Sequence, residues 1–474
     1  MIRREFILGA LPAIAAAPVF AAPPPGARRP NIIFILADDM GYGDASIYGQ
    51  RKISTPHIDR LAREGMLFTQ GYAGAPVCGP SRNALMTGQH TGHTRIRDNT
   101  SIAGGKLGTK GKGTQLWRRP NLLPEDRTVA QYLQAAGYRT GLMGKWHLDG
   151  FEANATPPRF GFDEFKGWLI QFESTQGYWP AQRVHGDKLV DIPENANGRH
   201  GRYGTHMITE DSVDFIERHK DQPFFLYVGY DSPHSPYTAP NFGPYADRAG
   251  WADDEKTYAA MIHYLDQGIG KLLDKLASAG LDKDTVVFFA SDNGPRSEPT
   301  AQQTRVADFF DSNGGLTGYK RDMYEGGIRD PWIVRWTGKI PAGAVSDVPV
   351  YFPDFLPTAL DLAGAPAEKS DGVSLKPFLV DPQRKATDRL LYWEFYDPEF
   401  RQAARWGKWK AVRLKRDGPL ELYDLSKDPK ESRNLAAQHP EVVAHMLAAM
   451  AREHVASNEY PDPAPEATPK RTEG

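Results

Sequence analysis

The run Ile32-Ile33-Phe34-Ile35-Leu36 is followed, after Ala37, by the acidic pair Asp38-Asp39. An unbroken apolar run of this kind is typical of a strand that is buried on both faces, as the strands of a parallel sheet are. Two more such runs occur later in the chain, at residues 224–228 and 286–290. Together the three runs predict the centre of a mostly parallel sheet.

Helical patterns lie between these strands. Thr55-Pro56 marks a helix start, with proline at the first helical position. Further helices are predicted at residues 129–136, around 213–217 and at 261–276, where apolar residues recur on one face. The alternation predicts an α/β fold in which helices cover both faces of a large sheet. In such sheets the chemistry lies at the carboxyl ends of the strands.

The pattern changes in the last part of the chain. Short strands are predicted at residues 391–395, 409–413 and 420–423, followed by a helix at about 441–456. These elements predict a smaller C-terminal antiparallel sheet with one helix.

The first residues have the composition of an export signal. Arg3-Arg4 precedes a short apolar stretch interrupted by Pro12 and Pro18, and Val19-Phe20-Ala21 offers a cleavage site. The paired arginines favour the twin-arginine route over the general secretory route, which is the alternative. The stretch is too short for a comfortable membrane span. The mature protein is therefore expected in the periplasm or outside a bacterial cell, exported by the twin-arginine or the general machinery.

The predicted organisation is a signal peptide at 1–22, a catalytic α/β domain at 30–385, a C-terminal α+β subdomain at 386–458 and a disordered tail at 459–474, rich in Pro and Glu. The length of 474 residues is too great for one average domain. A net charge of −2 lacks the basic excess of nucleic-acid binders, so no nucleic acid is expected as a partner.

Cys78 is the only cysteine in the sequence, so it cannot form an internal disulfide. It stands in the run Pro76-Val77-Cys78-Gly79-Pro80-Ser81-Arg82-Asn83-Ala84-Leu85-Met86-Thr87-Gly88. Turn-forming residues follow it and an apolar helical pattern then begins, so Cys78 is predicted where a loop enters a helix. There a reactive side chain gains from free backbone N–H groups and from the helix dipole. A functional cysteine is favoured over the alternative, a small buried hydrophobe.

Carboxylates follow two of the predicted buried strands. Asp38-Asp39 comes after the first strand, and Asp292-Asn293-Gly294 comes after the strand at 286–290. Because the carboxyl ends of parallel strands meet at one edge of a sheet, these side chains can converge. Adjacent carboxylates need a cation to offset their repulsion, and oxygen ligands suit a hard ion such as Ca²⁺ or Mg²⁺. The alternative for Asp38-Asp39 alone is a solvated turn.

The cysteine run resembles the signature of the type I, formylglycine-dependent sulfatases, with Cys-x-Pro-Ser-Arg followed by Leu-Met-Thr-Gly. The resemblance covers nearly the whole mature chain and implies an arylsulfatase-like sulfuric ester hydrolase with the alkaline-phosphatase-like fold. In this family a maturation enzyme converts the cysteine to formylglycine, an aldehyde that is hydrated in the resting enzyme. The resemblance implies formylglycine at position 78 and one Ca²⁺ whose ligands are Asp38, Asp39, Asp292, Asn293 and the modified Cys78.

Three further motifs are similar to sulfatase motifs. Gly144-Lys145-Trp146-His147 resembles the second signature, and the period of two of an extended segment would place Lys145 and His147 on the same side. Pro233-His234-Ser235-Pro236 holds a histidine between prolines; alone, this pattern fits a structural loop histidine equally well. The stretch from Lys320 to Tyr324-Glu325-Gly326-Gly327 is similar to the one that carries a substrate lysine in the family.

By resemblance, the family mechanism gives each of these residues a role. The hydrated formylglycine attacks sulfur in line, while Arg82 and Lys145 hold the diol and the metal-side oxygens. Lys320 and His234 meet the leaving-group oxygen and offer a proton. His147 then removes a proton from the second hydroxyl, so that sulfate leaves and the aldehyde is restored.

The resemblance implies a sulfated small molecule or glycan as the substrate, an aryl sulfate or a sulfated carbohydrate, and leaves the alcohol open. The alternative within enzymes is a phosphonate monoester or phosphodiester hydrolase, which shares the fold and the formylglycine. The alternative of another class is a non-catalytic sulfated-glycan-binding protein, if Cys78 is unmodified. Candidate contacts to the alcohol are Arg95, Arg97, Asp98 and Asn99 and, in a Gly-rich stretch, Lys106, Lys110, Lys112, Arg118 and Arg119.

Overall fold

The computed structural model describes residues 29–99, 101–102, 117–118, 120–149, 155–169, 178–297 and 301–461. The predicted signal peptide, the side chains of the Gly-rich stretch and the tail beyond residue 461 lie outside the described residues. In the part of the chain that is described, no helix combines the length and the apolar character that crossing a membrane requires.

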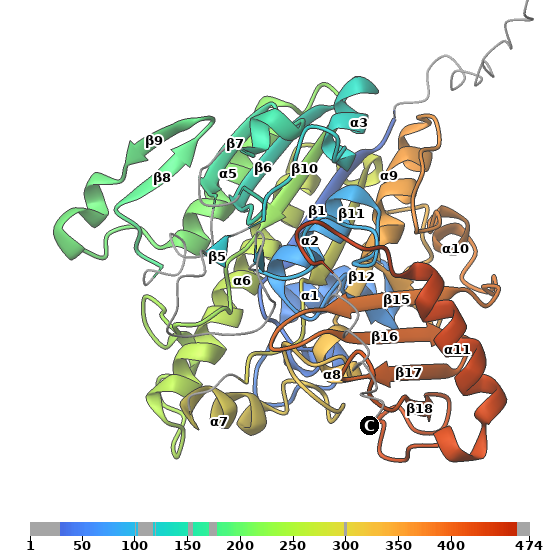
Figure 1. Cartoon of the computed structure of the whole chain (residues 1–474). Coiled ribbons are helices and arrows are strands. Elements are labelled where there is room, and N and C mark those ends of the chain that lie inside the picture. Colours follow the sequence, from blue (N-terminus) through green and yellow to red (C-terminus); the bar gives the residue numbers. More distant parts are fainter. Residues whose placement is uncertain are drawn as a thin grey trace, which may run out of the picture.

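A ten-stranded sheet forms the centre of the molecule (Figure 1). Its middle strands are β1 (Asn31–Ala37), β10 (Phe224–Gly229) and β11 (Thr285–Ser291), which coincide with the three predicted apolar runs. β1 pairs in parallel with both of the others, and Ile35 lies opposite Val228 in β10. Every residue of the three strands is buried, as the unbroken runs predict.

The remaining strands extend this centre on both sides and make the sheet mixed. They are β2 (Met66–Phe68), β6 (Arg139–Lys145), β7 (Glu164–Trp168), β8 (Gln182–His185), β9 (Lys188–Asp191), β12 (Trp332–Arg335) and β13 (Ala344–Ser346). The strand order is β13-β2-β12-β11-β1-β10-β6-β7-β8-β9. β6 and β7 continue the parallel pairing, whereas β12 is antiparallel to β11 and β8 is antiparallel to β7.

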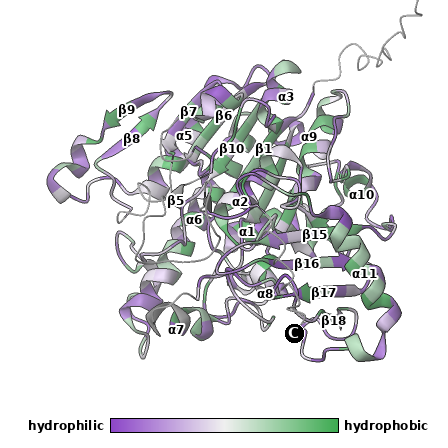
Figure 2. Cartoon of the chain, viewed as in Figure 1, coloured by the Kyte–Doolittle hydropathy of each residue, from purple (hydrophilic) through white to green (hydrophobic). Residues whose placement is uncertain are grey.

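Helices cover both faces of the sheet, as predicted. Phe34 and Ile35 of β1 belong to different core clusters, because successive side chains of a strand point to opposite faces. The helices on the Phe34 face are α2 (Cys78–Thr87), α3 (Val129–Ala135) and α9 (Phe355–Ala363). Those on the Ile35 face are α1 (Pro56–Arg63), α5 (Gly204–Arg218) and α6 (Asp253–Ser278). Figure 2 shows hydrophobic residues concentrated on the central strands between these layers.

A four-stranded antiparallel sheet forms the C-terminal subdomain. Its strands, in spatial order, are β15 (Leu390–Phe395), β16 (Arg401–Trp406), β17 (Trp409–Arg413) and β18 (Glu421–Asp424), and α11 (Pro440–Glu453) packs on one face (Figure 1). β16 was not predicted, because the segment Arg-Gln-Ala-Ala-Arg-Trp contains no β-branched residue. It also placed the end of the last helix three residues too late.

The predicted disordered tail begins too early. Tyr460 is only 1% exposed, and its ring packs against Tyr396 with a centroid distance of 4.7 Å. Its hydroxyl donates to the carbonyl oxygen of Asp98 at 3.0 Å. The apolar ring and this hydrogen bond hold the chain on the subdomain beyond the predicted boundary at 459.

A buried ion network joins the subdomain to the catalytic part. Nζ of Lys410 in β17 donates to Glu325 at 2.9 Å and to Glu431 at 3.1 Å, and all three side chains are 0% exposed. Glu325 begins the short helix α8 (Glu325–Ile328). Burial opposes the ionisation of Glu325, but Lys410 and nearby arginines lower its pKa to about 2. Lys410 is therefore the cation that the two carboxylates share.

Replacing Lys410 by methionine is expected to lower the free energy of unfolding by about 3–5 kcal/mol, because Glu325 and Glu431 lose the buried cation that they share, although Glu325 keeps Arg329 at 3.3 Å. The matched control is Lys408→Met, which removes a pair with Asp424 at 2.7 Å in which the lysine side chain is 48% exposed. That control should cost about 1 kcal/mol or less. Denaturant unfolding of both variants measures the difference, and equal losses would contradict the central role of Lys410.

Candidate active site

The predicted functional residues meet at the carboxyl end of the parallel strands. Asp38-Asp39 follows β1, Asp292-Asn293 follows β11, and His234 lies in the loop after β10. Lys145 is the last residue of β6, on the other side of β10. The convergence of the two acidic motifs that the sequence predicted is confirmed: the Asp39 amide donates to Oδ1 of Asp292 at 3.2 Å.

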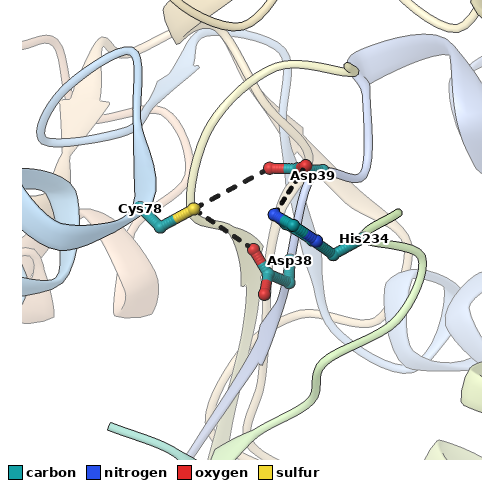
Figure 3. Close-up of side chains that lie close together, drawn as sticks. All are labelled: Asp38, Asp39, Cys78 and His234. Atoms are coloured by element: carbon teal, nitrogen blue, oxygen red, sulfur yellow. Dashed lines mark hydrogen bonds and ion pairs between the residues drawn. The ribbon is translucent and has the colours of Figure 1, made fainter. Parts of the chain in front are cut away.

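Cys78 is the first residue of α2, as predicted, and it is fully buried. Its Sγ lies 3.4 Å from Oδ1 of Asp38, 3.9 Å from Oδ1 of Asp39 and 3.4 Å from Nζ of Lys320. Figure 3 shows that the side chains of Cys78, Asp38, Asp39 and His234 point toward one another. Burial raises the pKa of the Cys78 thiol to about 12. The unmodified side chain is therefore protonated at neutral pH and a weak nucleophile.

The backbone at the start of α2 is held by a side chain. The amide of Gly79 donates to Oδ1 of Asn99 at 2.9 Å, so one of the N–H groups expected to be free has a partner. A Cβ atom at position 79 would lie 2.7 Å from this oxygen, which explains the glycine beside Cys78. Asn99, a candidate contact to the substrate, thus supports the backbone next to the nucleophile position.

The conformation of Asp39 brings the loops after β1 and β11 together. Its φ is +65°, in the left-handed region that few residues other than glycine adopt. In this turn Oδ1 of Asp39 accepts from Nδ2 of Asn293 at 2.8 Å and from Nζ of Lys320 at 2.6 Å. Such backbone strain persists only where the surrounding contacts enforce it.

The carboxylates of Asp292 and Asp38 also pair with buried cations. Nε and Nη2 of Arg82 lie 2.9 and 2.8 Å from Oδ2 of Asp292, and Nζ of Lys145 pairs with Oδ2 of Asp38. Burial together with the Asp38 charge raises the pKa of Asp292 to about 7, against the effect of Arg82. Burial also acts on Asp38, but Lys145 and the neighbouring cations hold the pKa of that carboxyl well below its usual range. The site therefore balances a dense group of charges without solvent.

The described residues fit a hard cation. Oδ2 of Asp39 and Oδ1 of Asn293 are buried and have no hydrogen-bond partner within the described part of the chain. Buried acceptors without partners are costly, and a bound Ca²⁺ would satisfy them with the oxygen ligands that it prefers. Ligand atoms of Asp38, Asp39, Cys78 and His234 all lie within 4.8 Å of one another.

His234 belongs to this group, whereas the sequence suggested either a proton donor or a structural loop histidine. Its Nδ1 donates to the carbonyl oxygen of Ser235 at 2.5 Å, which leaves Nε2 facing Oδ2 of Asp39 at 3.5 Å. Burial lowers the pKa of His234 to about 4, although Asp39 opposes the shift. Because Nδ1 carries the proton of the neutral ring, Nε2 can act as an acid only in the imidazolium form, which an anionic substrate beside it would favour.

The expected extended geometry of Lys145 and His147 is wrong. β6 ends at Lys145, and His147 has a φ of +67°, which takes it out of the strand alternation. Its amide donates to the carbonyl of Leu169 at 3.0 Å, and its own carbonyl would lie 3.8 Å from a Cβ atom on Gly79. His147 is therefore buried beside the nucleophile position because of a left-handed turn.

Two of the candidate contacts to the alcohol serve other parts of the molecule. Nη1 of Arg97 donates to Glu394 at 2.5 Å, inside the C-terminal subdomain. Arg95 pairs with Glu125 and Asp126. Both guanidinium groups therefore have carboxylate partners outside the candidate site.

One tyrosine of the site was not predicted. The hydroxyl of Tyr178 contacts the carbonyl oxygens of Asp231 at 2.6 Å and of His234 at 2.5 Å, and so holds the loop that carries the histidine. No motif surrounds Tyr178, and only its tertiary contacts reveal its role.

Known families and proteins resemble this chain over most of its length. Residues 30–365 match the family model described as Sulfatase, and residues 316–456 match the model described as N-sulphoglucosamine sulphohydrolase, C-terminal. The chain is 34% identical over 472 residues to arylsulfatase A of Homo sapiens, covering 88% of this chain and 86% of that protein. It is 30% identical over 498 residues to N-acetylgalactosamine-6-O-sulfatase of Bacteroides thetaiotaomicron, covering 88% and 92%. The fold matches that of Ps i-CgsB, solved in complex with k-i-k-neocarrahexaose, with a TM-score of 0.76 and 27% identity over 92% of this chain and 96% of that one.

Proposed function

Because the chain belongs to the sulfatase family and is a hydrolase of sulfate esters, we propose that it acts on a sulfate monoester of an aryl alcohol or a carbohydrate, with residue 78 in the formylglycine form and one Ca²⁺ bound. The observation that carries the proposal is the position of Cys78: it is buried at the start of a helix, within 3.9 Å of two carboxylates and a lysine. The relatives named above, an arylsulfatase and a carbohydrate sulfatase, support both classes of alcohol.

Formylglycine and calcium would supply what ordinary side chains lack. In the hydrated formylglycine form, residue 78 would offer one hydroxyl as the nucleophile and a second one from which a proton can be removed. A calcium ion held by Asp38, Asp39, Asp292 and Asn293, next to residue 78, would supply positive charge for the sulfate oxygens. The buried thiol itself, with its raised pKa, is poorly suited to nucleophilic attack.

The cations of the site orient these groups and bind the anion. Arg82 fixes the Asp292 carboxylate through two nitrogens, and Lys145 neutralises Asp38. Lys320 lies between Asp39 and residue 78, where its ammonium can reach the leaving-group oxygen. Preorganised charges of this kind in a water-excluded site stabilise a transition state without reorganising.

The proposed activity is tested with one purified sample assayed on 4-nitrophenyl sulfate, on sulfated mono- and oligosaccharides and on an aryl phosphonate monoester. Faster turnover of a sulfate ester is the expected result. Preference for the phosphonate would favour the phosphonate monoester hydrolase alternative. Native protein that retains the intact thiol and binds sulfated glycans without turnover would favour the glycan-binding alternative. The maturation enzyme and the export route stay predictions of the sequence.

His234→Ala is expected to lose about 10²–10⁴-fold in kcat/KM on a sulfated sugar and much less on 4-nitrophenyl sulfate. A sugar alkoxide is a strong base whose departure needs a proton, whereas nitrophenolate is stable as an anion. The control is Lys145→Ala, which should depress both substrates alike because Lys145 pairs with Asp38. Equal losses from His234→Ala on both substrates would reassign His234 to sulfate binding or to structure.

A further inference from the structure

A cavity of about 880 Å³, the seam cavity, lies between the central sheet and the C-terminal subdomain. Its walls include Thr69-Gln70 after β2, residues 345–349 at the end of β13, residues 382–389 before β15, and Arg405, Gly407 and Lys408 at the turn from β16 to β17. No residue of the candidate active site lines it. β2 is three strands away from β1 in the sheet, about 14 Å at the usual spacing of neighbouring strands. The seam cavity is therefore separate from the candidate active site.

The seam cavity has an excess of positive charge. Six basic side chains line it, against the two carboxylates of Asp347 and Asp388. Three of the six, Arg384, Lys385 and Arg405, form no ion pair within the described part of the chain. A concave surface in which one sign of charge dominates concentrates its field, so the cavity attracts anions.

Arg405 supplies a buried cation to the wall of the cavity. The residue is only 5% exposed. Its Nε donates to the carbonyl oxygen of Gly407 at 3.2 Å, its Nη1 to the hydroxyl of Tyr72 at 2.6 Å, and its Nη2 to Oε1 of Gln70. These partners are neutral, and they use three of the five N–H groups of the guanidinium. Two N–H groups of a buried cation therefore remain for a further acceptor.

The neighbouring ion network does not balance this charge. Glu325 and Glu431 are its two carboxylates, and they already share Lys410. Arg329, which also lines the cavity, pairs with Glu325 at 3.3 Å. Burial raises the pKa of Glu431 to about 7, although Lys410 opposes the shift. With Arg405, three cations thus face two carboxylates, and an anion in the cavity would offset the cost of the buried positive charge.

We propose that the seam cavity is a second, non-catalytic site that binds a sulfate group, either free or carried on a saccharide. A guanidinium binds an oxyanion through parallel hydrogen bonds, and Arg405 has N–H groups for them. The exposed Arg384 and Lys385 add charge to the same cavity. Sulfate is the oxyanion that the chain meets, because a hydrolase of sulfate esters encounters it on the substrate and as the product. The volume is that of cavities that enclose small organic ligands, so a sugar ring fits besides the sulfate.

The test is equilibrium dialysis of the purified full-length chain against labelled inorganic sulfate, and then against a labelled sulfated disaccharide, at constant ionic strength. The chain carries Cys78→Ala, so that no ester is turned over during dialysis. Two sulfate ions per chain are expected, one in the active site and one in the seam cavity. The seam variant, Arg384→Gln with Lys385→Gln, should weaken one of them by about 10- to 100-fold, as expected for hydrogen bonds between charged groups.

The control is Arg433→Gln with Lys339→Gln, which removes two exposed positive charges that line no part of the cavity. It should bind sulfate as the parent chain does. Arg405→Lys keeps the buried charge but loses the planar fork, and should weaken the same ion as the seam variant. Thermal unfolding without sulfate shows whether each variant keeps its fold.

Unchanged sulfate binding in the seam variant would overturn the inference, and so would an equal loss in the seam variant and the control, which would reduce the effect to net charge. With Cys78 intact, the seam variant should keep its kcat/KM on 4-nitrophenyl sulfate, and a fall would contradict a separate site. Tighter binding of the disaccharide than of inorganic sulfate at the seam supports the saccharide as the source, and equal affinity supports the free ion. Sulfate binding at the seam by a wild-type protein that hydrolyses no sulfate ester would overturn the proposed function but not this inference.

Discussion

Cys78→Ala is expected to abolish sulfate release from every substrate, with a loss in kcat on the order of 10⁴-fold or more, as when the nucleophile of a hydrolase is removed. Position 78 is buried at the point where Asp38, Asp39 and Lys320 converge. Alanine removes the attacking atom together with one of the implied calcium ligands but leaves Asp38, Asp39 and Lys320 in place, so chemistry should stop while the buried cations still bind the anion. The measurement is kcat on 4-nitrophenyl sulfate and on a sulfated sugar, together with sulfate-product affinity.

Cys78→Ser is the matched control for the modification. In a host that converts only cysteine, the serine variant should be as inactive as the alanine variant, because neither side chain offers a second hydroxyl. Peptide mass spectrometry of the wild-type protein should show formylglycine at position 78 in proportion to its activity. Fully active protein in which only the intact thiol is found would contradict the assignment of formylglycine to position 78.

Asp292→Ala is expected to lose both the bound metal and activity, by about 10³-fold or more, because several kcal/mol of charge stabilisation disappear with the ion. The carboxylate also anchors Arg82 through two contacts and accepts the Asp39 amide. Its removal therefore disturbs two further groups of the site. Elemental analysis gives the calcium content, and thermal unfolding with and without added calcium reports binding independently of turnover.

Asp371→Asn is the control, since Asp371 belongs to a second group of ligand-type side chains with His90 and His93, away from the nucleophile position. Calcium content should be unchanged in this variant and should be lost in Asp292→Ala. If Asp371→Asn alone lost the ion, the metal would have to be assigned to the second group. Full turnover by metal-free wild-type protein would contradict the proposed requirement for calcium.

The central strands could be predicted because their signal is local. The runs at β1, β10 and β11 are apolar without interruption, and each proved to be buried over its whole length. β16 could not be predicted, because its burial comes from neighbours on both sides and its own residues have weak strand preference. The start of the tail was misjudged for a related reason, since the buried contact of Tyr460 is with Asp98, far away in the chain.

Within the site, the motifs identified the side chains but did not reveal their partners. The sequence placed Arg82, Asp292 and Lys320 in one site by resemblance. The sequence did not predict that Arg82 forms an ion pair with Asp292 or that Lys320 contacts both Asp39 and residue 78. Arg97 shows the converse: it follows the helix α2 in sequence, yet its side chain contacts Glu394 of the C-terminal subdomain.

What the sequence alone determined is the class of fold and the set of reactive side chains, because both are encoded in consecutive residues: apolar runs for buried strands, and short motifs at their ends. What only the tertiary structure decided is the pairing of charges and the exposure of each cation. Those depend on strand order and on loop conformations such as the left-handed turn at Asp39, which brings its amide to Asp292. The physical reason is that burial and electrostatic contact are properties of neighbours in space, which the order of residues along a chain does not specify.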